Sequence, residues 1–362
     1  ADPITRAELI NILSNMVDTL VKETTTVTEN VSGSLLISAA DGATLKGIRI
    51  GGDLILAPGV TKDVTLVDCV IQGNIRNYGT GEVRFEAPQI TPESTATKPS
   101  EVYKPGATLD RTLEYGGKTV PIYRDRPLNV FSDVDFIWTG EENENQRRLE
   151  YLGGEFRTRY GIDVSSFQGE INWDAVADDN IDFAMVRVGF RGTGTGSLNT
   201  DKYYEQNIRG AMRAGLETGV YFFAQAVTVE EAIEEADYVI SLLDGLDING
   251  PVAYDWEMHD STYRVYGTSP EMATACAVAF CERIKDAGYT PMVYGGTYVT
   301  YMKYDQGALA DYLSWYPEYK SEKSEKLCPT LVYHMDYWQF SSSRAVAGIN
   351  GRVDMNIQFI RR

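Results

Sequence analysis

The chain has 362 residues, enough for two domains, one of them with a large core of its own. Its 52 acidic and 33 basic residues give a formal net charge of −19, which argues against a nucleic-acid-binding protein and against a polybasic membrane-surface protein. No apolar run approaches the roughly 18 residues of a membrane span. The start at Ala1-Asp-Pro looks trimmed or introduced by cloning, which is compatible with removal of an export signal and leaves that point open.

Cysteine and histidine content argues against a metal or cofactor site. The four cysteines form no C-x-x-C pair, so neither a zinc knuckle nor a thioredoxin-like site is expected. Only two histidines, His259 and His334, are available for a zinc site or a Ser-His-Asp triad. We therefore predict no metal and no cofactor. The 23 tyrosines and five tryptophans suit a protein that stacks on sugar rings.

The first predicted element is an amphipathic helix over Ile4–Val21. Thr5 can cap its start, and the apolar residues from Leu9 to Leu20 recur at helical spacing. We expect this helix to cap the segment that follows it.

Residues 31–87 contain short β-prone runs broken by glycines. Thr44–Leu54 aligns with Thr65–Ile75 at a spacing of 21 residues, and a repeat of this length with alternating apolar residues predicts rungs of a short β-solenoid. Such a module is typical of an adhesive, a spacer or a targeting element, whose ligand would lie on a cell surface. The residues expected to point inward are Leu45, Ile48, Ile50, Leu54, Leu56, Leu66, Cys69, Ile71 and Ile75.

Three domains are predicted from these changes in composition. Residues 1–99 comprise the capping helix, the solenoid-like module and a Pro/Thr-rich linker. Residues 100–159 form an extension that packs on the next domain. Residues 160–362 alternate between strands and helices, which predicts an α/β fold, a compact TIM-like (β/α) barrel. The predicted strands are Gly161–Val164, Phe183–Val188, Val220–Ala224, Val252–Trp256, Pro291–Tyr294, Tyr312–Trp315, Tyr333–Trp338 and Val353–Met355. The predicted helices are Tyr203–Ala214, Val229–Leu243 and Glu271–Ala287. Thr228 is expected to cap the second, and Ser269 or Pro270 to stand at the start of the third.

Two acids stand at the C-terminal end of the predicted strand Val252–Trp256. Asp255 and Glu257 occupy alternate positions, roughly 6.6 Å apart along a strand and on the same face. Two such acids cannot both ionise freely, so the pKa of one should rise, as glycoside hydrolysis requires. The alternatives are a solvated acidic turn and a structural ion pair. Functional residues of such barrels gather at the C-terminal ends of the strands, where we also place Asp163 and Asp354.

Several motifs in residues 160–360 resemble those of glycoside hydrolase family 25, the N,O-diacetylmuramidases or Chalaropsis-type lysozymes. They are Gly161-Ile-Asp-Val-Ser-Ser-Phe-Gln-Gly, Gly219-Val-Tyr-Phe-Phe, Asp255-Trp-Glu, Trp338-Gln-Phe and Val353-Asp-Met-Asn. The resemblance implies a barrel that cleaves peptidoglycan without a cofactor. It does not extend to the solenoid-like module.

The resemblance also implies roles for individual residues. Glu257 matches the general acid/base, and Asp255 matches its partner, either a nucleophile or the group that holds the substrate's N-acetyl group. Asp163 and Asp354 match the remaining acids. The family often has His where this chain has Phe222, so subsite preference is left open. The residues expected to bind sugar are Tyr221, Phe223, Tyr294, Trp315, Tyr337, Trp338 and Gln339.

Three functions remain open from the sequence. The first is a lysozyme, secreted or associated with the bacterial cell wall, that cuts peptidoglycan between N-acetylmuramic acid and N-acetylglucosamine. The second is a chitinase-like enzyme, whose longer acidic motif would need acids where this chain has Gly250 and Ala253. The third is a non-catalytic wall-binding surface protein that keeps the barrel as a scaffold.

Overall fold

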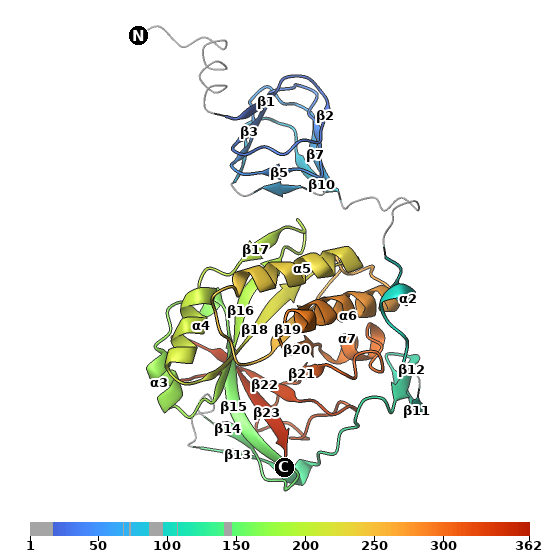
Figure 1. The fold of residues 1–362 in the computed structure, drawn as a ribbon, viewed down its shortest axis with the longest axis vertical. Helices are drawn as coiled ribbons and strands as arrows, with labels where there is room; N and C mark the ends of the chain where they lie inside the picture. Colours follow the sequence, from blue (N-terminus) through green and yellow to red (C-terminus); the bar gives the residue numbers. More distant parts are fainter. Residues whose placement is uncertain (1–16, 68, 72–73, 87–96, 107, 141–146) are drawn as a thin grey trace. The chain divides into compact units, whose positions relative to one another are not determined.

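The computed structural model (Figure 1) describes residues 17–67, 69–71, 74–86, 97–106, 108–140 and 147–362. The chain divides into two compact units, Ala1–Thr95 with Gly194–Ser197, and Ala96–Thr193 with Leu198–Arg362. Among the described residues, no helix is long and apolar enough to span a membrane.

The strands described in the first unit all pair in parallel. They form three narrow sheets, ordered β1-β3-β6-β9, β10-β7-β4-β2 and β5-β8 (Figure 1). The strands are β1 (Thr19–Val21), β2 (Thr26–Val27), β3 (Leu35–Ile37), β4 (Thr44–Lys46), β5 (Arg49–Ile50), β6 (Leu54–Leu56), β7 (Val64–Val67), β8 (Val70–Ile71), β9 (Ile75–Asn77) and β10 (Val83–Glu86).

The 21-residue repeat reappears in the pairing of these strands. Leu45 lies beside Leu66, and Ile50 lies beside Ile71, as the alignment of the two repeats requires. The leucines, like Ile50, are almost completely buried because equivalent positions of successive repeats stack into one core. The prediction for Ile75 is wrong. Its side chain is 40% exposed, because β9 is the last strand of its sheet and no further strand covers it.

Most of the predicted helix over Ile4–Val21 lies outside the described residues. Its last residues form strand β1, which pairs in parallel with β3, so this part of the prediction is wrong. Thr19 and Val21 are β-branched, which favours a strand, and Val21 is buried against the core of the first unit. Pairing with β3 satisfies the backbone here without a helix.

Residues 97–151 form the extension of the second unit. Its elements are α2 (Pro99–Val102), β11 (Leu109–Tyr115), β12 (Lys118–Tyr123), the 3₁₀ turn Asp133–Asp135, β13 (Phe136–Thr139) and β14 (Arg148–Tyr151). Gly116 and Gly117 link β11 to β12, and both have positive φ, as a tight hairpin turn with the twist of its strands requires. Ile122, Phe136 and Leu149 are buried in the core that surrounds the barrel.

Eight strands close into a barrel in the second unit (Figure 1). The order is β15-β23-β22-β21-β20-β19-β18-β16, and β16 returns to pair with β15. Neighbouring strands are parallel except around β23, which is antiparallel to both β15 and β22. The barrel strands are β15 (Phe156–Val164), β16 (Phe183–Arg191), β18 (Glu217–Ala224), β19 (Val252–Trp256), β20 (Pro291–Tyr294), β21 (Leu313–Pro317), β22 (Tyr337–Arg344) and β23 (Val353–Arg361), and β17 (Leu198–Thr200) extends β16 as a hairpin.

Helices pack around the first strands of the barrel. They are α3 (Trp173–Asp178), α4 (Tyr204–Arg213), α5 (Val229–Leu242), α6 (Pro270–Asp286) and α7 (Thr297–Met302). The Thr228 and Ser269 side chains accept hydrogen bonds from backbone amides three residues later, so both act as the N-caps that the sequence indicates.

The strand–helix alternation ends after α7. The connection from β21 to β22 is described in full and contains no helix. β22 and β23 form an antiparallel pair, and the glycines between them, Gly348 and Gly351, have positive φ. The last strand therefore runs in the opposite direction to the other seven. Its N-terminal end lies beside their C-terminal ends.

Candidate active site

The four acids singled out from the sequence lie at the barrel end where the parallel strands finish. Asp163 is the penultimate residue of β15, Asp255 the penultimate residue of β19, and Glu257 follows β19 directly. Asp354 was expected at the C-terminal end of its strand, but it is the second residue of β23. It reaches the same end because β23 is antiparallel, which pairs it directly with Asp163.

Asp163 accepts two hydrogen bonds through one carboxylate oxygen. The donors to Oδ2 are Gln339 Nε2 and Asn356 Nδ2, each at 2.8 Å. Asn356 is oriented in turn by Trp315, whose Nε1 donates to Asn356 Oδ1 at 2.8 Å. Burial raises the pKa of Asp163 to about 6, although these hydrogen bonds oppose the rise.

Asp354 holds a proton more tightly than its partner Asp163. Burial, then the negative charge of Asp163, raises the pKa of Asp354 to about 8. At neutral pH, protonated Asp354 can therefore donate a hydrogen bond to the Asp163 carboxylate. The pair keeps one proton at this end of the barrel.

Asp255 faces the barrel interior, and its side chain is almost buried at 7% exposure. Burial, followed by the charges of Glu257 and Asp163, raises its pKa well above the ordinary value, whereas Arg187 opposes the rise. Arg187 is already paired with Asp201, at 2.8 Å between Nη2 and Oδ2. Among the described residues nothing hydrogen-bonds to Asp255 Oδ1. A buried hydrogen-bond acceptor without a partner lowers the stability of the fold, so its presence indicates a functional role.

Glu257 lies just beyond the end of β19 and keeps a quarter of its side chain exposed. Its Oε2 lies 2.7 Å from Nε2 of His259, a side chain that is 63% exposed. Its backbone oxygen accepts a hydrogen bond from Gln225 Nε2 at 2.8 Å. The partly exposed carboxylate is therefore attached to a backbone that the Gln225 side chain holds in place.

Gln225 is completely buried and connects Glu257 to helix α5. Its backbone amide donates to Glu235 Oε1 at 3.0 Å, and its carbonyl accepts from Arg264 Nη1 at 3.0 Å. Arg264 also forms two hydrogen bonds to Glu231. The loop that follows Glu257 is thus tied to α5 at both of its ends.

The aromatic residues expected to bind sugar divide into two groups. Tyr221, Tyr294 and Trp315 point into the barrel, where Trp315 contacts both tyrosines edge to face. Tyr294 donates to Gln339 Oε1 at 3.1 Å, so Gln339 links it to Asp163. Phe223 shares the inward face of β18 by alternation with Tyr221 and is partly exposed.

The structure does not bring Tyr337 and Trp338 to the acids. Tyr337 packs on Phe183 at the start of β16, and its hydroxyl accepts from Gln358 Nε2 at 2.7 Å, at the opposite end of the barrel. Trp338 is fully buried on the outer face of β22, where it packs on Phe136 of the extension. Both are core residues because strand position and alternation direct them away from the site.

Several residues beside the acids were not singled out from the sequence. Asn356 stands two positions after Asp354, and the repeated spacing of the D-x-E motif could have indicated it. Tyr319 is 54% exposed and donates to Gln339 Oε1 at 3.1 Å. Phe167 follows β15 and is 85% exposed, with the Arg187 guanidinium 5.1 Å from its ring centre. Exposed aromatic rings beside an acidic site are typical sugar platforms, but no local pattern identifies them.

Among the described residues, no group of three His, Cys, Asp or Glu side chains is placed to hold a metal ion. Asp163 accepts instead from the side-chain amides of Gln339 and Asn356.

The family model for glycosyl hydrolases family 25 matches residues 162–349, more than half of the 362 residues. The chain belongs to glycosyl hydrolases family 25. The barrel is a glycoside hydrolase domain, as the motifs predicted. Asp163, Asp255 and Glu257 lie inside the matched range, and Asp354 lies just beyond it.

Relatives share this domain at modest identity. The autolytic lysozyme of Clostridium acetobutylicum is 25% identical over 197 residues, which are 54% of this chain and 54% of that protein. Lysozyme M1 of Streptomyces globisporus is 27% identical over 201 residues, which are 54% of this chain and 66% of that protein. The solved bacterial lysozyme of Streptomyces coelicolor is 26% identical, with a TM-score of 0.45, and the match covers 55% of this chain and 90% of that one. The chain thus spans about half to two thirds of the length of these curated relatives.

Proposed function

We propose that the family 25 barrel is a muramidase that cleaves the β-1,4 bond between N-acetylmuramic acid and N-acetylglucosamine in peptidoglycan. The observation that carries the proposal is the placement of Asp255 and Glu257 at the end of β19, beside Asp163 and Asp354 at the same end of the barrel. Glycoside hydrolysis needs one protonated and one ionised carboxyl group on the scissile bond. The lysozyme names of the relatives support peptidoglycan as the substrate.

Glu257 acts as the general acid and base in this proposal. It is the more exposed of the two acids and stands past the end of β19, where it can reach a leaving oxygen. Asp255 is the buried partner. Its oxygen Oδ1, which has no partner among the described residues, suits the N–H of the substrate's 2-acetamido group. A bound donor stabilises the ionised form of Asp255 and lowers its pKa, so Asp255 can carry the negative charge of the pair once substrate is bound.

The other acids and the inward aromatic residues hold the sugar. Asp163, with the Asp354 proton beside it, offers a carboxylate to sugar hydroxyls. Tyr221, Phe223 and Tyr294 line the route to the acids. Burial raises the pKa of Tyr294, so its phenol stays a hydrogen-bond donor throughout the physiological range. Gln339 positions Asp163, and Trp315 positions Asn356.

Hydrolysis proceeds with net retention of the anomeric configuration. In this mechanism the acetamido oxygen attacks the anomeric carbon while Glu257 protonates the leaving oxygen, and water then opens the cyclic intermediate with Glu257 as base. NMR of the first-formed anomer tests the stereochemistry, and an initial α product would refute retention. A covalent adduct trapped on Asp255 would leave retention standing and refute the acetamido route.

The test of the activity is hydrolysis of purified bacterial walls. We expect turbidity to fall and new reducing ends to carry muramic acid. Reducing ends of N-acetylglucosamine would identify a different glycosidase. A properly folded chain that binds walls and releases no reducing ends would identify a non-catalytic wall-binding protein.

The proposal extends to the first unit and to the site of action. The parallel strands with a 21-residue repeat support a short β-solenoid, which we assign to wall or surface attachment outside the bacterial cell. Comparing the full chain with a chain that begins at Ala96 tests this role. Equal retention of the two on purified walls would refute it.

A further inference from the structure

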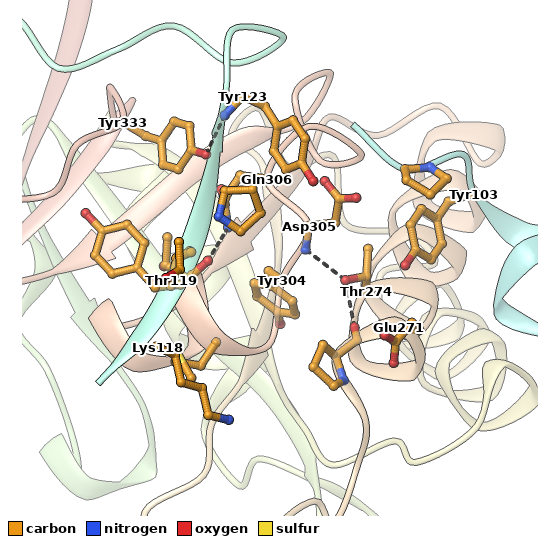
Figure 2. Close-up of a pocket in the computed structure, with 17 residues that line it drawn as sticks. Tyr103, Lys118, Thr119, Tyr123, Glu271, Thr274, Tyr304, Asp305, Gln306 and Tyr333 are labelled. Atoms are coloured by element: carbon orange, nitrogen blue, oxygen red, sulfur yellow. Dashed lines mark hydrogen bonds between the residues drawn. The ribbon is translucent and has the colours of Figure 1, made fainter. Parts of the chain in front are cut away.

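A cavity of about 400 Å³ lies on the flank of the barrel, and none of the four acids lines it. One wall comes from the extension, namely Tyr103 and strand β12. The other wall comes from the start of helix α6 and from the segment after α7 (Figure 2). The extension lies outside residues 162–349, so one wall of this cavity is built by a part of the chain that the family model does not include.

The two walls are fixed to each other by direct contacts. Gly106 N donates to Asp305 Oδ2 at 2.9 Å. Tyr123 N donates to the Tyr333 hydroxyl at 3.0 Å (Figure 2). A Cβ added to Gly106 would lie 2.9 Å from Cα of Gly307, so the two backbones touch where the walls meet. The cavity is therefore formed before any ligand binds, as sites for small molecules usually are, and its volume lies in their range of about 300–1,000 Å³.

Tyrosine rings and hydroxyl groups dominate the lining. Rings come from both walls, and Figure 2 shows the Tyr103 and Tyr123 hydroxyls turned towards the space between them. Burial raises the pKa of both phenols, so they remain neutral donors and acceptors. Lys118 and Glu271 stand on opposite walls with opposite charges. The Asp305 carboxylate is already used, because its oxygens accept from backbone amides.

These features select among ligand classes. An anionic ligand would meet the carboxylates of Glu271 and Asp305. A hydrocarbon chain would cover the Tyr103 and Tyr123 hydroxyls, which face the cavity, without offering either of them a hydrogen bond. A peptide that binds as an added strand needs free backbone groups, but Tyr123 N and Asp305 N are already bonded. A pyranose ring offers an apolar face for the tyrosine rings and hydroxyls that both donate and accept.

We propose that this flank cavity is a second, non-catalytic carbohydrate site that holds an uncharged pyranose unit of a glycan. The identification of that glycan as the N-acetylglucosamine-containing wall strand rests on the muramidase function proposed above. A site on the flank keeps the enzyme attached to its polymer between cleavage events, because one chain then contacts the protein at two places. The extension thereby contributes to substrate binding as well as to the core.

The test uses the full chain carrying Glu257→Gln and a photoreactive diazirine derivative of N,N′-diacetylchitobiose. Labelled peptides are mapped by mass spectrometry. We expect labels in residues 103–123 or 270–306, separately from labels near the four acids. Thr119→Trp fills the cavity from β12, and Tyr103→Ala removes one wall, so each should lower the flank labelling about tenfold. Thr112→Trp, on the neighbouring strand β11 and outside the cavity lining, is the matched control and should leave it unchanged.

Each result decides the proposal. Absence of flank labels, or flank labels that survive both Thr119→Trp and Tyr103→Ala in folded protein, would overturn it. Flank labelling by a diazirine stem tetrapeptide in place of the sugar probe would assign the cavity to peptide and also overturn it. The proposed muramidase activity is measured apart, on walls with the unmutated chain. Failure of that activity with flank labelling intact would refute the catalytic proposal alone.

Discussion

Asp163 and Asp354 lie directly opposite each other on the antiparallel strands β15 and β23. Asp163 is buried and Asp354 is half-buried, and burial raises the pKa of Asp163 to about 6 and that of Asp354 to about 8. Two carboxylates that face each other away from bulk water cannot both stay ionised at neutral pH, so the pair keeps one proton. This relationship makes the stability of the barrel depend on pH in a direction opposite to that of an ordinary ion-paired carboxylate.

Replacing Asp354 with Asn should flatten that dependence. The folded protein keeps Asp354 protonated up to about pH 8, whereas the unfolded chain ionises it near pH 4, so unfolding releases a proton between these values. Stability is then highest below the unfolded pKa and falls as pH rises, by at most about 1.4 kcal/mol per pH unit from this group. Denaturant unfolding at about pH 6, 7 and 8 measures it.

Tryptophan fluorescence makes this measurement specific to the second unit, because all five tryptophans belong to it. They are Trp138, Trp173, Trp256, Trp315 and Trp338. Equal slopes of stability against pH in the unmutated chain and in Asp354→Asn would show that Asp354 does not hold the proton.

Glu257→Gln should reduce wall hydrolysis by about 10²–10⁴-fold, since an amide cannot deliver a proton to the leaving oxygen. The fold should be unchanged, because the side chain lies partly exposed beyond the end of β19. The matched control is Glu205→Gln on the exposed face of helix α4, which should keep full activity. Release of reducing ends measures both variants. Near-normal turnover of Glu257→Gln would remove Glu257 from the acid role.

Gln225→Met should lower kcat about tenfold with a smaller change in KM, because it removes the donor that fixes the Glu257 backbone while keeping the volume of the side chain. The comparison variant is Gln206→Met, at an exposed position of α4. A positioning role predicts a shift in the pH dependence of kcat, which general destabilisation would not produce. A loss of thermal stability with unchanged kcat and unchanged pH dependence would count against it.

Deleting residues 1–95 should leave a folded barrel that still hydrolyses small soluble wall fragments. The cut should not extend to residue 99, because Thr97 N donates to Glu230 at 2.7 Å and α2 packs on α6. Loss of activity on soluble fragments after the shorter deletion would mean that the first unit helps to build the site.

A longer deletion, of residues 1–126, provides the contrast. It removes Ile122, which is fully buried, and Arg126, whose guanidinium bonds to Gln306 inside the core. We expect it to cost at least about 3–5 kcal/mol and to leave the barrel insoluble or unstable. A stable, active barrel without residues 1–126 would show that the extension is dispensable.

The sequence alone determined the local elements of this protein and the identity of its central motif. Strand Val252–Trp256 has the bounds that the apolar run predicts, and Asp255 faces inward because strand residues alternate. The helix caps Thr228 and Ser269 follow from side chains that bond to nearby amides. The 21-residue repeat likewise appears as parallel pairing. Period, caps and repeats are properties of neighbouring residues, so they can be read from one chain.

Only the tertiary structure decided which distant residues meet. The direction of β23 places Asp354 against Asp163, and no pattern within β23 specifies that direction. The same lack of long-range information put Trp338 at the site in the sequence prediction, although the extension covers it through Phe136. Gln225 contacts Glu257 across 32 positions of the chain. Such contacts depend on strand order and register, which are set by the packing of the whole core and not by the residues beside each position.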